Sequence, residues 1–259
     1  MTAIDCKGVT RRYANGTEAL GPVDLKILGG EFVSLLGPSG CGKSTLLRII
    51  AGLDAPSTGS VAVDARARSS RGIGFVFQEP TLMPWASVRD NVRLPLRLTG
   101  DDSAAGHARI DDCIARVGLT EFAGAYPRQL SGGMKMRASL ARALVTDPDI
   151  LLLDEPFAAL DEITRFRLNN DLLALWRDLR KTVVFVTHSV FESVFLSQRV
   201  IVMTARPGRI FAEQRIDAPE PRGESFRTSA SYAGFCREVS AMLGQASAET
   251  SAETSGQVA

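Results

Sequence analysis

A glycine-rich stretch near the N-terminus has the residue types and spacing of a phosphate-binding loop. It matches the pattern G-x-x-x-x-G-K-[ST] at every defined position. An apolar run at 32–36 precedes it and a helical pattern at 46–51 follows it, which is the strand, loop and helix order of such a site. The residues are, in order, Gly37, Pro38, Ser39, Gly40, Cys41, Gly42, Lys43, Ser44 and Thr45.

The chemistry of this stretch suits a nucleoside triphosphate. Glycines let successive backbone N–H groups point at one anion, and the start of a helix adds partial positive charge at the same place. Lys43 can supply a full charge for the β- and γ-phosphates, and the Ser44 hydroxyl can bind Mg²⁺. We therefore expect a triphosphate and its magnesium ion at this loop.

Two adjacent acids follow a second apolar run, 150–153, that reads as a buried strand. Ligands of parallel-sheet proteins bind at the carboxyl ends of the strands, so we expect these acids to face the phosphate loop. Asp154 is placed to bind Mg²⁺, and Glu155 can orient and polarise the attacking water. The alternative is a pair of acids that caps the turn before Pro156.

Two further polar residues end predicted strands. His188, one of two histidines, closes the run 183–187 and can reach the γ-phosphate, although a structural histidine is the alternative. Gln78 follows the predicted strand 72–77 and could touch Mg²⁺ or water. Considered alone, Gln78 fits a solvent-facing side chain better.

A second helix start is also suited to an anion. Ser131 is a predicted cap, and the glycines after it open an amphipathic helix; the stretch reads Leu130, Ser131, Gly132, Gly133. One triphosphate does not need two such sites from one subunit. We therefore expect the second site to serve the nucleotide of another copy, with two copies in isologous contact around two nucleotides.

The remaining pattern predicts an α/β fold with a parallel sheet. Antiparallel strands and a hairpin are expected within 4–28, a strand at 60–63, edge strands at 199–203 and 209–212, and a helical insert at about 84–146. A helix between the two buried strands carries one apolar stripe, formed by Leu168, Leu172, Leu175 and Leu179. Residues 245–259 repeat Ser-Ala-Glu-Thr with little apolar content and are expected to be a disordered tail.

Composition narrows the functional classes. The formal net charge is +1 over 259 residues, so no general attraction to nucleic acid is expected. No apolar run approaches the ~18–20 residues that span a bilayer, and the first residues lack a signal-peptide core, so we expect a cytoplasmic chain. The four cysteines are far apart, so we expect neither a disulfide framework nor a cysteine metal site.

The chain resembles the ATP-binding subunit of ATP-binding-cassette (ABC) transporters over about residues 4–214, because six motifs occur in the order that is typical of that family. They are the phosphate loop, Gln78 as the Q-loop, 130–133 as the signature, 152–155 as Walker B, 159–161 as the D-loop and His188 as the switch. Tyr13 stands where this family places an aromatic ring on adenine. The resemblance implies a P-loop NTPase (RecA-like) core with an N-terminal antiparallel β subdomain and a helical insert, in a domain at 1–244.

The same resemblance implies a mechanism and partners. ATP binding would close a head-to-tail homodimer in which Leu130–Met134 contact the ATP of the facing subunit and Asp161 lies at the seam. The segment 78–85 and the helical insert would receive a cytoplasmic helix of a transmembrane permease. The subunit would then sit on the cytoplasmic face of the cell membrane and would serve an extracytoplasmic solute-binding protein indirectly.

Within this family, the chain is similar to importers of nitrate, sulfonate, taurine or related solutes. The residues that carry this similarity are 82–85, 131–135 and 157–165. Met134 and Met136 depart from residues usual in the wider family. Three alternatives are an exporter subunit, a soluble ATPase acting on DNA or ribosomes, and a small-molecule kinase. The chain lacks the heptads of DNA-repair members and has one cassette rather than two, and a kinase would not use the second helix start.

Overall fold

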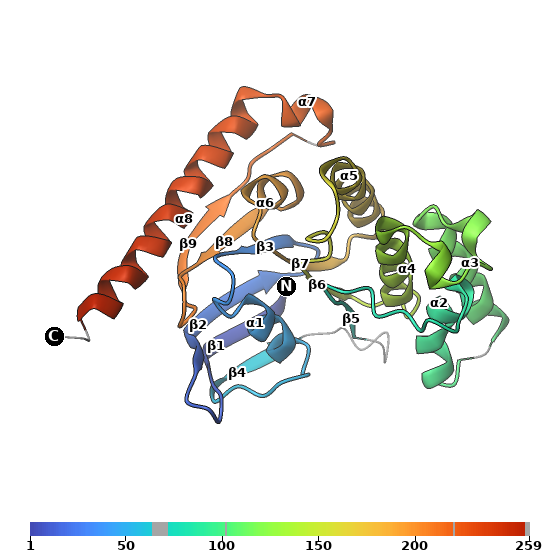
Figure 1. Ribbon diagram of the computed structural model, residues 1–259, viewed down its shortest axis with the longest axis horizontal. Helices are drawn as coiled ribbons and strands as arrows, with labels where there is room; N and C mark the ends of the chain where they lie inside the picture. The colour runs from blue at the N-terminus through green and yellow to red at the C-terminus, as the bar shows by residue number, and fades with distance from the viewer. Residues whose placement is uncertain (64–71, 102, 220, 257–259) are drawn as a thin grey trace. The chain divides into compact units, whose positions relative to one another are not determined.

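The computed structural model describes residues 1–63, 72–101, 103–219 and 221–256 of the 259-residue chain. The chain divides into two compact units: one contains 1–64 and 182–259, and the other contains 65–181. Each unit has its own strands and helices (Figure 1). No helix among the described residues is long and apolar enough to cross a membrane.

The first unit begins with an antiparallel sheet. Strands β1 (Thr2–Arg12), β2 (Glu18–Leu28) and β4 (Thr58–Val63) pair in the order β2-β1-β4. Buried and exposed residues alternate along the second half of β2, as in a sheet with one covered face. The predicted antiparallel strands and hairpin of the N-terminal region are confirmed.

The first unit also holds parallel strands in the order β7-β3-β8. Strands β7 (Thr182–Thr187) and β3 (Phe32–Leu36) are buried along their whole length, and β8 (Arg199–Met203) is buried after its first residue. Strand β9 (Ile210–Arg215) pairs antiparallel with β8 at the edge. Continuous apolar runs are typical of strands covered on both faces, and these strands lie where the sequence predicted them.

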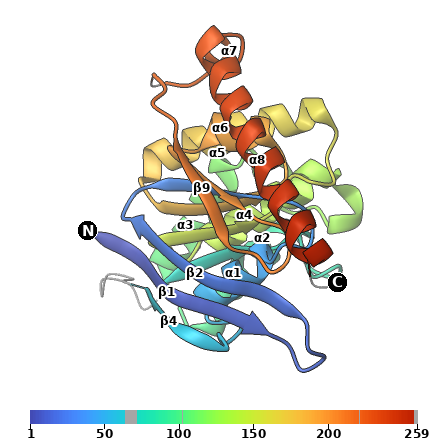
Figure 2. The ribbon, with the colours of Figure 1, turned by 90° about the vertical axis from the view of Figure 1, so that its left-hand side faces the viewer.

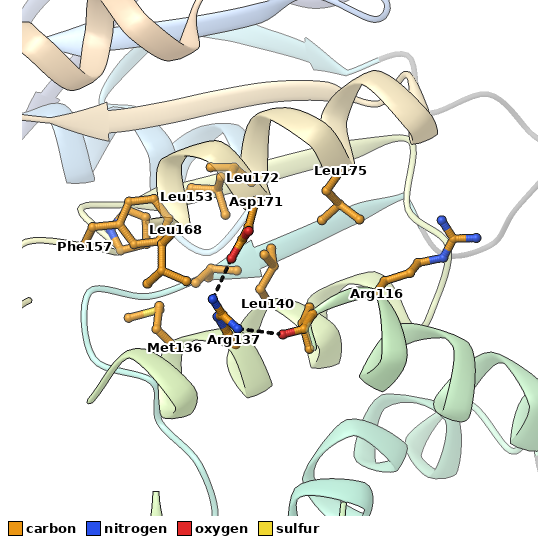
Figure 3. A pocket seen from close by; sticks show the side chains of 13 residues that line it. Arg116, Met136, Arg137, Leu140, Leu153, Phe157, Leu168, Asp171, Leu172 and Leu175 are labelled. Atoms are coloured by element: carbon orange, nitrogen blue, oxygen red, sulfur yellow. Dashed lines mark hydrogen bonds and ion pairs between the residues drawn. The ribbon is translucent and has the colours of Figure 1, made fainter. Parts of the chain in front are cut away.

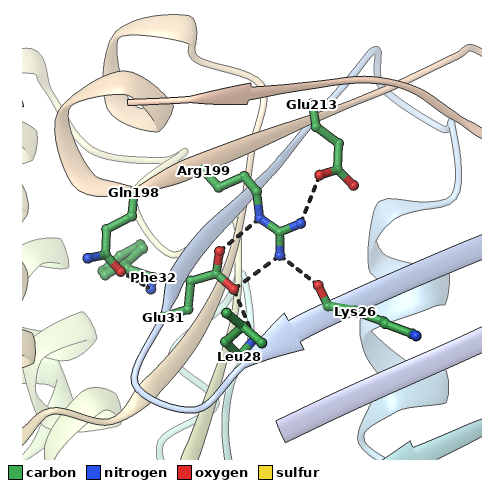
Figure 4. Close-up of polar contacts among 7 residues, drawn as sticks. All are labelled: Lys26, Leu28, Glu31, Phe32, Gln198, Arg199 and Glu213. Carbon is green, nitrogen blue, oxygen red and sulfur yellow. Dashed lines mark hydrogen bonds and ion pairs between the residues drawn. The ribbon is translucent and has the colours of Figure 1, made fainter. Parts of the chain in front are cut away.

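One arginine ties the start of β8 to the residue before β3, to the second half of β9 and to the last residues of β2 (Figure 4). The guanidinium of Arg199 makes a two-pronged ion pair with Glu31, at 2.8 and 3.0 Å, and a further bond of 2.8 Å to Glu213. Its Nη2 also donates to the carbonyl oxygen of Lys26 at 2.6 Å. Such fork geometry fixes orientation as well as charge, so Arg199 sets how the ends of β2, β3, β8 and β9 meet.

A C-terminal helix that the sequence analysis did not predict covers the sheet edge. Helix α8 (Ala230–Gly256) lies along β8 and β9 (Figures 1 and 2). It packs through a buried stripe formed by Tyr232, Cys236, Val239 and Ala246. Because the helix continues to Gly256, the structure differs from the disordered tail expected at 245–259; residues 257–259 lie outside the described part. Alanine and glutamate favour helix even where little apolar surface is buried.

The second unit combines a parallel strand pair with helices. Strands β5 (Ile73–Val76) and β6 (Ile150–Asp154) pair in register. Between them lie α2 (Val88–Leu98), α3 (Ala104–Arg116) and α4 (Gly132–Leu144), which account for the predicted helical insert. Two short 3₁₀ helices, Thr120–Phe122 and Pro127–Gln129, connect α3 to α4, and α5 (Glu162–Leu179) follows β6.

Polar side chains start the helices of the second unit. Ser87, Ser103, Ser131 and Asp161 each accept a bond from a backbone N–H in the first turn of α2, α3, α4 and α5. Caps of this kind satisfy amides that have no partner within the helix.

Candidate functional site

The phosphate loop joins β3 to helix α1 (Lys43–Ile50). Gly40 and Gly42 have φ values of +75° and +97°, which only glycine adopts freely. A Cβ at Gly42 would lie 2.5 Å from the carbonyl oxygen of Ala19, so a larger residue would displace the loop. Gly42 provides no side-chain cap, and the first turn of α1 therefore presents backbone amides, as an anion site requires.

The ammonium group of Lys43 lies over this loop. Lys43 is 3% exposed, and its Nζ donates to the carbonyl oxygens of Gly37 at 2.7 Å and Pro38 at 2.9 Å. The buried thiol of Cys41 lies 3.8 Å from the same nitrogen, and burial raises the pKa of this thiol although Lys43 opposes the shift. The thiol is therefore held in its neutral, less reactive form.

His188 ends its strand beside the loop. Strands β3 and β7 are parallel and pair Leu36 with Thr187, so Gly37 and His188 are the next residues along adjacent strands. The His188 side chain is exposed. The structure thus places the imidazole and the phosphate loop at the same end of the sheet in the first unit.

Tyr13 also reaches the start of α1. Its hydroxyl lies 3.3 Å from Oγ1 of Thr45, and the guanidinium of Arg11 lies 4.8 Å from the centre of its ring. Arg11 is itself held by an ion pair with Asp54 at 2.7 Å. An aromatic ring is therefore fixed next to the phosphate loop.

In the second unit, Asp154 is the last residue of β6 and Glu155 follows it. The register pairs Val76 with Leu153, so Gln78 and Glu155 both lie two residues beyond a paired position. Asp154 is 5% exposed, Glu155 is half-buried and Gln78 is exposed. Glu155 has a φ of +45°, a left-handed conformation that costs a non-glycine residue about 1–3 kcal/mol and clusters at functional sites.

The signature stretch needs its glycines for close packing. Ser131 caps α4 by accepting from the Met134 N–H at 3.2 Å. A Cβ at Gly133 would lie 2.8 Å from Cγ2 of Thr164, and one at Gly132 would lie 3.2 Å from Cδ2 of Leu160. The start of α4 therefore rests against the start of α5 and the D-loop residues before it.

Asp161 caps α5 through its carboxylate. Its Oδ1 accepts from the Thr164 N–H at 2.9 Å, and the hydrogen bonds from Thr164 hold the pKa of Asp161 below its usual range. The exposed carboxylate stays charged, and it lies in the segment that packs against the signature glycines. Signature and D-loop are therefore one contiguous feature of the second unit.

Met136 faces inward, away from the signature surface. It is 4% exposed and lines an apolar pocket between α4 and α5 with Leu140, Leu168 and other side chains (Figure 3). An ion pair of 2.6 Å between Arg137 and Asp171 borders this pocket. The departure at Met136 is thus accommodated by packing within the second unit.

Two residues that the sequence analysis missed hold the segment after Gln78. Arg142 donates to the carbonyl oxygens of Pro80 (2.9 Å) and Thr81 (2.8 Å), and burial lowers its pKa. Asn91 is fully buried and both accepts from the Met83 N–H at 2.7 Å and donates to its carbonyl at 3.2 Å. Arg142 reaches carbonyls 61 and 62 residues away in sequence, whereas Asn91 bonds to backbone atoms of Met83, eight residues before it. Because all these partners are backbone atoms, no residue type signals either role.

The predicted site residues therefore form two groups. The first unit brings together Tyr13, the phosphate loop and His188. The second unit holds the predicted Q-loop, signature, Walker B and D-loop residues. The residues of the second group are Gln78, Leu130, Ser131, Gly132, Gly133, Met134, Asp154, Glu155 and Asp161.

Comparison with known proteins identifies the family. The profile described as ABC transporter matches residues 20–158. The chain belongs to the ABC transporter family. An aliphatic sulfonates import ATP-binding protein of Xanthomonas axonopodis pv. citri is 49% identical to this ABC chain over 208 residues, covering 79% of it and 82% of the relative. A taurine import ATP-binding protein of Rhizobium johnstonii is 44% identical over 239 residues, covering 90% and 91%.

A solved structure supports the fold and the reaction. The dimeric, post-hydrolysis state of an ATP-binding cassette bound to ADP and Pi matches with a TM-score of 0.73 and 37% identity, covering 83% of this chain and 100% of that one. This ABC chain is accordingly an ATP-binding, ATP-hydrolysing subunit with the α/β fold of P-loop NTPases.

Proposed function

We propose that this ABC ATPase is the energy-coupling subunit of an importer for taurine, an aliphatic sulfonate or a similar small solute such as nitrate. The observation that carries the proposal is its identity of 44% and 49%, over most of the chain, to import ATP-binding proteins for taurine and aliphatic sulfonates. The residues at 82–85, 131–135 and 157–165 suggested the same subgroup.

The first unit would bind most of the nucleotide. The amides of the phosphate loop and the Lys43 ammonium would hold the β- and γ-phosphates, because the ammonium already lies over the loop carbonyls. Tyr13 would stack on adenine from its place beside Thr45. His188 would donate an imidazole N–H to a γ-phosphate oxygen, since its strand ends beside the loop.

The donor set fits magnesium. Ser44, Gln78 and Asp154 offer a hydroxyl, an amide oxygen and a carboxylate, which are the hard oxygen ligands that Mg²⁺ prefers. A bound Mg²⁺ would supply neutralisation of the charge that develops on the phosphate oxygens. Glu155 would orient the attacking water and take its proton, and its left-handed backbone is consistent with that task.

A second copy would complete the site. Leu130–Met134 would contact the ATP bound by the facing subunit, with Asp161 at the seam of a head-to-tail homodimer. The helix start at Ser131 supports this role, because its amides and partial positive charge suit a phosphate. ATP would favour the closed dimer only through its higher affinity for that state, and hydrolysis would remove that preference.

A permease would dock on the second unit. The segment 78–85 is fixed by Arg142 and Asn91, yet Trp85 is 76% exposed, as expected of an aromatic anchor that awaits a partner helix. In this arrangement the domain at 1–244, with its helical subdomain at about 84–146, is peripheral on the cytoplasmic face of the membrane. It serves an extracytoplasmic solute-binding protein through the permease and binds no nucleic acid.

The test is affinity purification of the tagged chain from detergent-solubilised membranes of the cells that make it. The expected result is co-purification with a multi-spanning protein, together with uptake of taurine or an alkanesulfonate in the complemented deletion strain. Trp85→Ala should lose the membrane protein and keep basal ATP hydrolysis. Recovery with ribosomes or DNA, or unchanged uptake of every small anion in the deletion strain, would contradict the proposal.

A further inference from the structure

A buried arginine near the C-terminus caps the short helix that follows His188. Helix α6 (Val190–Leu196) ends in carbonyl groups that have no partner within the helix itself. Arg222 is 6% exposed and donates to three carbonyl oxygens at this end, those of Val194 (3.4 Å), Phe195 (3.1 Å) and Ser197 (2.7 Å). Its charge also suits the negative end of the helix dipole. Arg222 therefore anchors the end of α6.

Aromatic residues of the C-terminal helices hold the same helix from the side. Phe226 of α7 (Glu224–Arg227) stacks on Phe195 with 6.5 Å between ring centres, and Tyr232 of α8 meets Phe226 edge-on at 5.2 Å. The Tyr232 hydroxyl donates to the carbonyl oxygen of Phe191 at 2.9 Å. Burial raises the pKa of Tyr232, so this hydroxyl keeps the proton that it donates.

The other end of α6 is tied to the residues on either side of His188. Thr187 donates through Oγ1 to Glu192 at 2.5 Å and accepts from the Ser189 N–H at 3.0 Å. Ser189 caps α6 by accepting from the Glu192 N–H at 3.3 Å. The backbone that carries the His188 imidazole is therefore continuous with the first turn of α6.

We propose that Arg222 and Tyr232 are positioning residues for His188. Helix α6 has seven residues, and a helix of two turns is not stable on its own, so its place depends on what packs against it. Helix α8 and the strands β3, β7 and β8 provide that packing (Figure 1). The C-terminal segment thus fixes α6, and α6 fixes the backbone from which the imidazole projects.

This inference rests on the proposed role of His188, and it predicts a specific kinetic defect. Lys43 is held by carbonyls of its own loop, so loss of the Arg222 and Tyr232 contacts to α6 should leave the affinity for ATP unchanged. A misplaced His188 should instead slow the chemical step. Tyr232→Phe, which removes only one hydroxyl, should lower kcat roughly three- to tenfold, as expected for one lost hydrogen bond, and change the Kd for ATP less than about twofold.

The experiment measures kcat, the Kd for ATP and the melting temperature of the full-length chain. Arg222→Lys keeps the charge but not the fork of donors, and its kcat should fall further. Val239→Ala is the control, because Val239 is buried on the same helix two turns beyond Tyr232. It should lower the melting temperature while kcat at 20 °C stays within about twofold.

A double variant separates positioning from general stability. In a His188→Ala background, Tyr232→Phe should cause no further loss of kcat, because both changes act on the same imidazole. Three results would each overturn the inference. The first is a wild-type kcat in Tyr232→Phe, and the second is an equal loss of kcat in Tyr232→Phe and Val239→Ala at equal melting temperature. The third is a loss of kcat from Tyr232→Phe that adds fully to that of His188→Ala. Full activity of His188→Ala alone would instead overturn the proposed site.

Discussion

Adding one methyl group at Gly133 should destabilise the second unit, because the start of α4 rests on the start of α5. The new Cβ of Gly133→Ala would lie 2.8 Å from Cγ2 of Thr164, about 0.7 Å inside an ordinary carbon–carbon contact. Thr164 is a branched residue in the first turn of α5, with its N–H bonded to Asp161, so it can yield little.

The size of the effect follows from two opposing terms. Overpacking of this kind costs about 1–3 kcal/mol, whereas replacing glycine by alanine in a helix gains up to about 1 kcal/mol. We expect a net loss of about 1–2 kcal/mol, which lowers the melting temperature of a chain of this size by roughly 2–8 °C. The measurement is thermal unfolding without nucleotide, so that any contact with ATP does not contribute.

Thr164→Ser removes the methyl group that the new Cβ would meet. In that background Gly133→Ala should become neutral or stabilising by up to about 1 kcal/mol, which reverses the sign of its effect. ATP hydrolysis should remain impaired in both backgrounds, because the added methyl group still occupies the helix start proposed to face ATP. An equal loss of stability with Thr164 and with Ser at this position would refute the packing explanation.

Three further predictions concern other parts of the molecule. Lys43→Ala should weaken ATP binding roughly 10- to 150-fold, as expected for the loss of one charged hydrogen bond. Titration with a fluorescent ATP analogue measures this affinity, and an unchanged affinity would contradict the phosphate-loop assignment. Arg142→Ala should lower the free energy of unfolding by about 1–3 kcal/mol, because the two hydrogen bonds to the carbonyls of Pro80 and Thr81 are lost. The peptide bond after Thr81 should then become open to limited proteolysis. Cleavage as slow as in the wild type would contradict this prediction. Burial raises the pKa of Cys6 to about 12 and that of Cys113 to about 11. Iodoacetamide at pH 8 should therefore alkylate both thiols slowly in the native protein and quickly in urea, as measured by mass spectrometry. Rapid labelling of the native protein would show that these thiols are not buried.

Much of the fold could be predicted because its signals are local in sequence. The runs at 150–153 and 183–186 are apolar without interruption, so they predict strands covered on both faces. The serine before each of α3 and α4 marks where the helix begins. The glycine pattern and the strand before it likewise indicated the phosphate loop before any contact was known.

The features that escaped prediction depend on distant partners. Helix α8 buries few and mostly small side chains, and its stability comes from α6 and the sheet edge rather than from a strong apolar period. Arg222 bonds to backbone carbonyls about 25 residues away, and no residue type announces such a partner. The left-handed conformation of Glu155 likewise depends on the turn that follows β6 rather than on a glycine.

We propose that ATP joins two copies of this chain and that its hydrolysis separates them. The most direct measurement is the mass in solution, by light scattering, of Glu155→Gln with ATP and Mg²⁺ and then with ADP. We expect a stable dimer with ATP, little turnover, and monomers with ADP. Monomers that retain ATP, or brisk hydrolysis by Glu155→Gln, would contradict it.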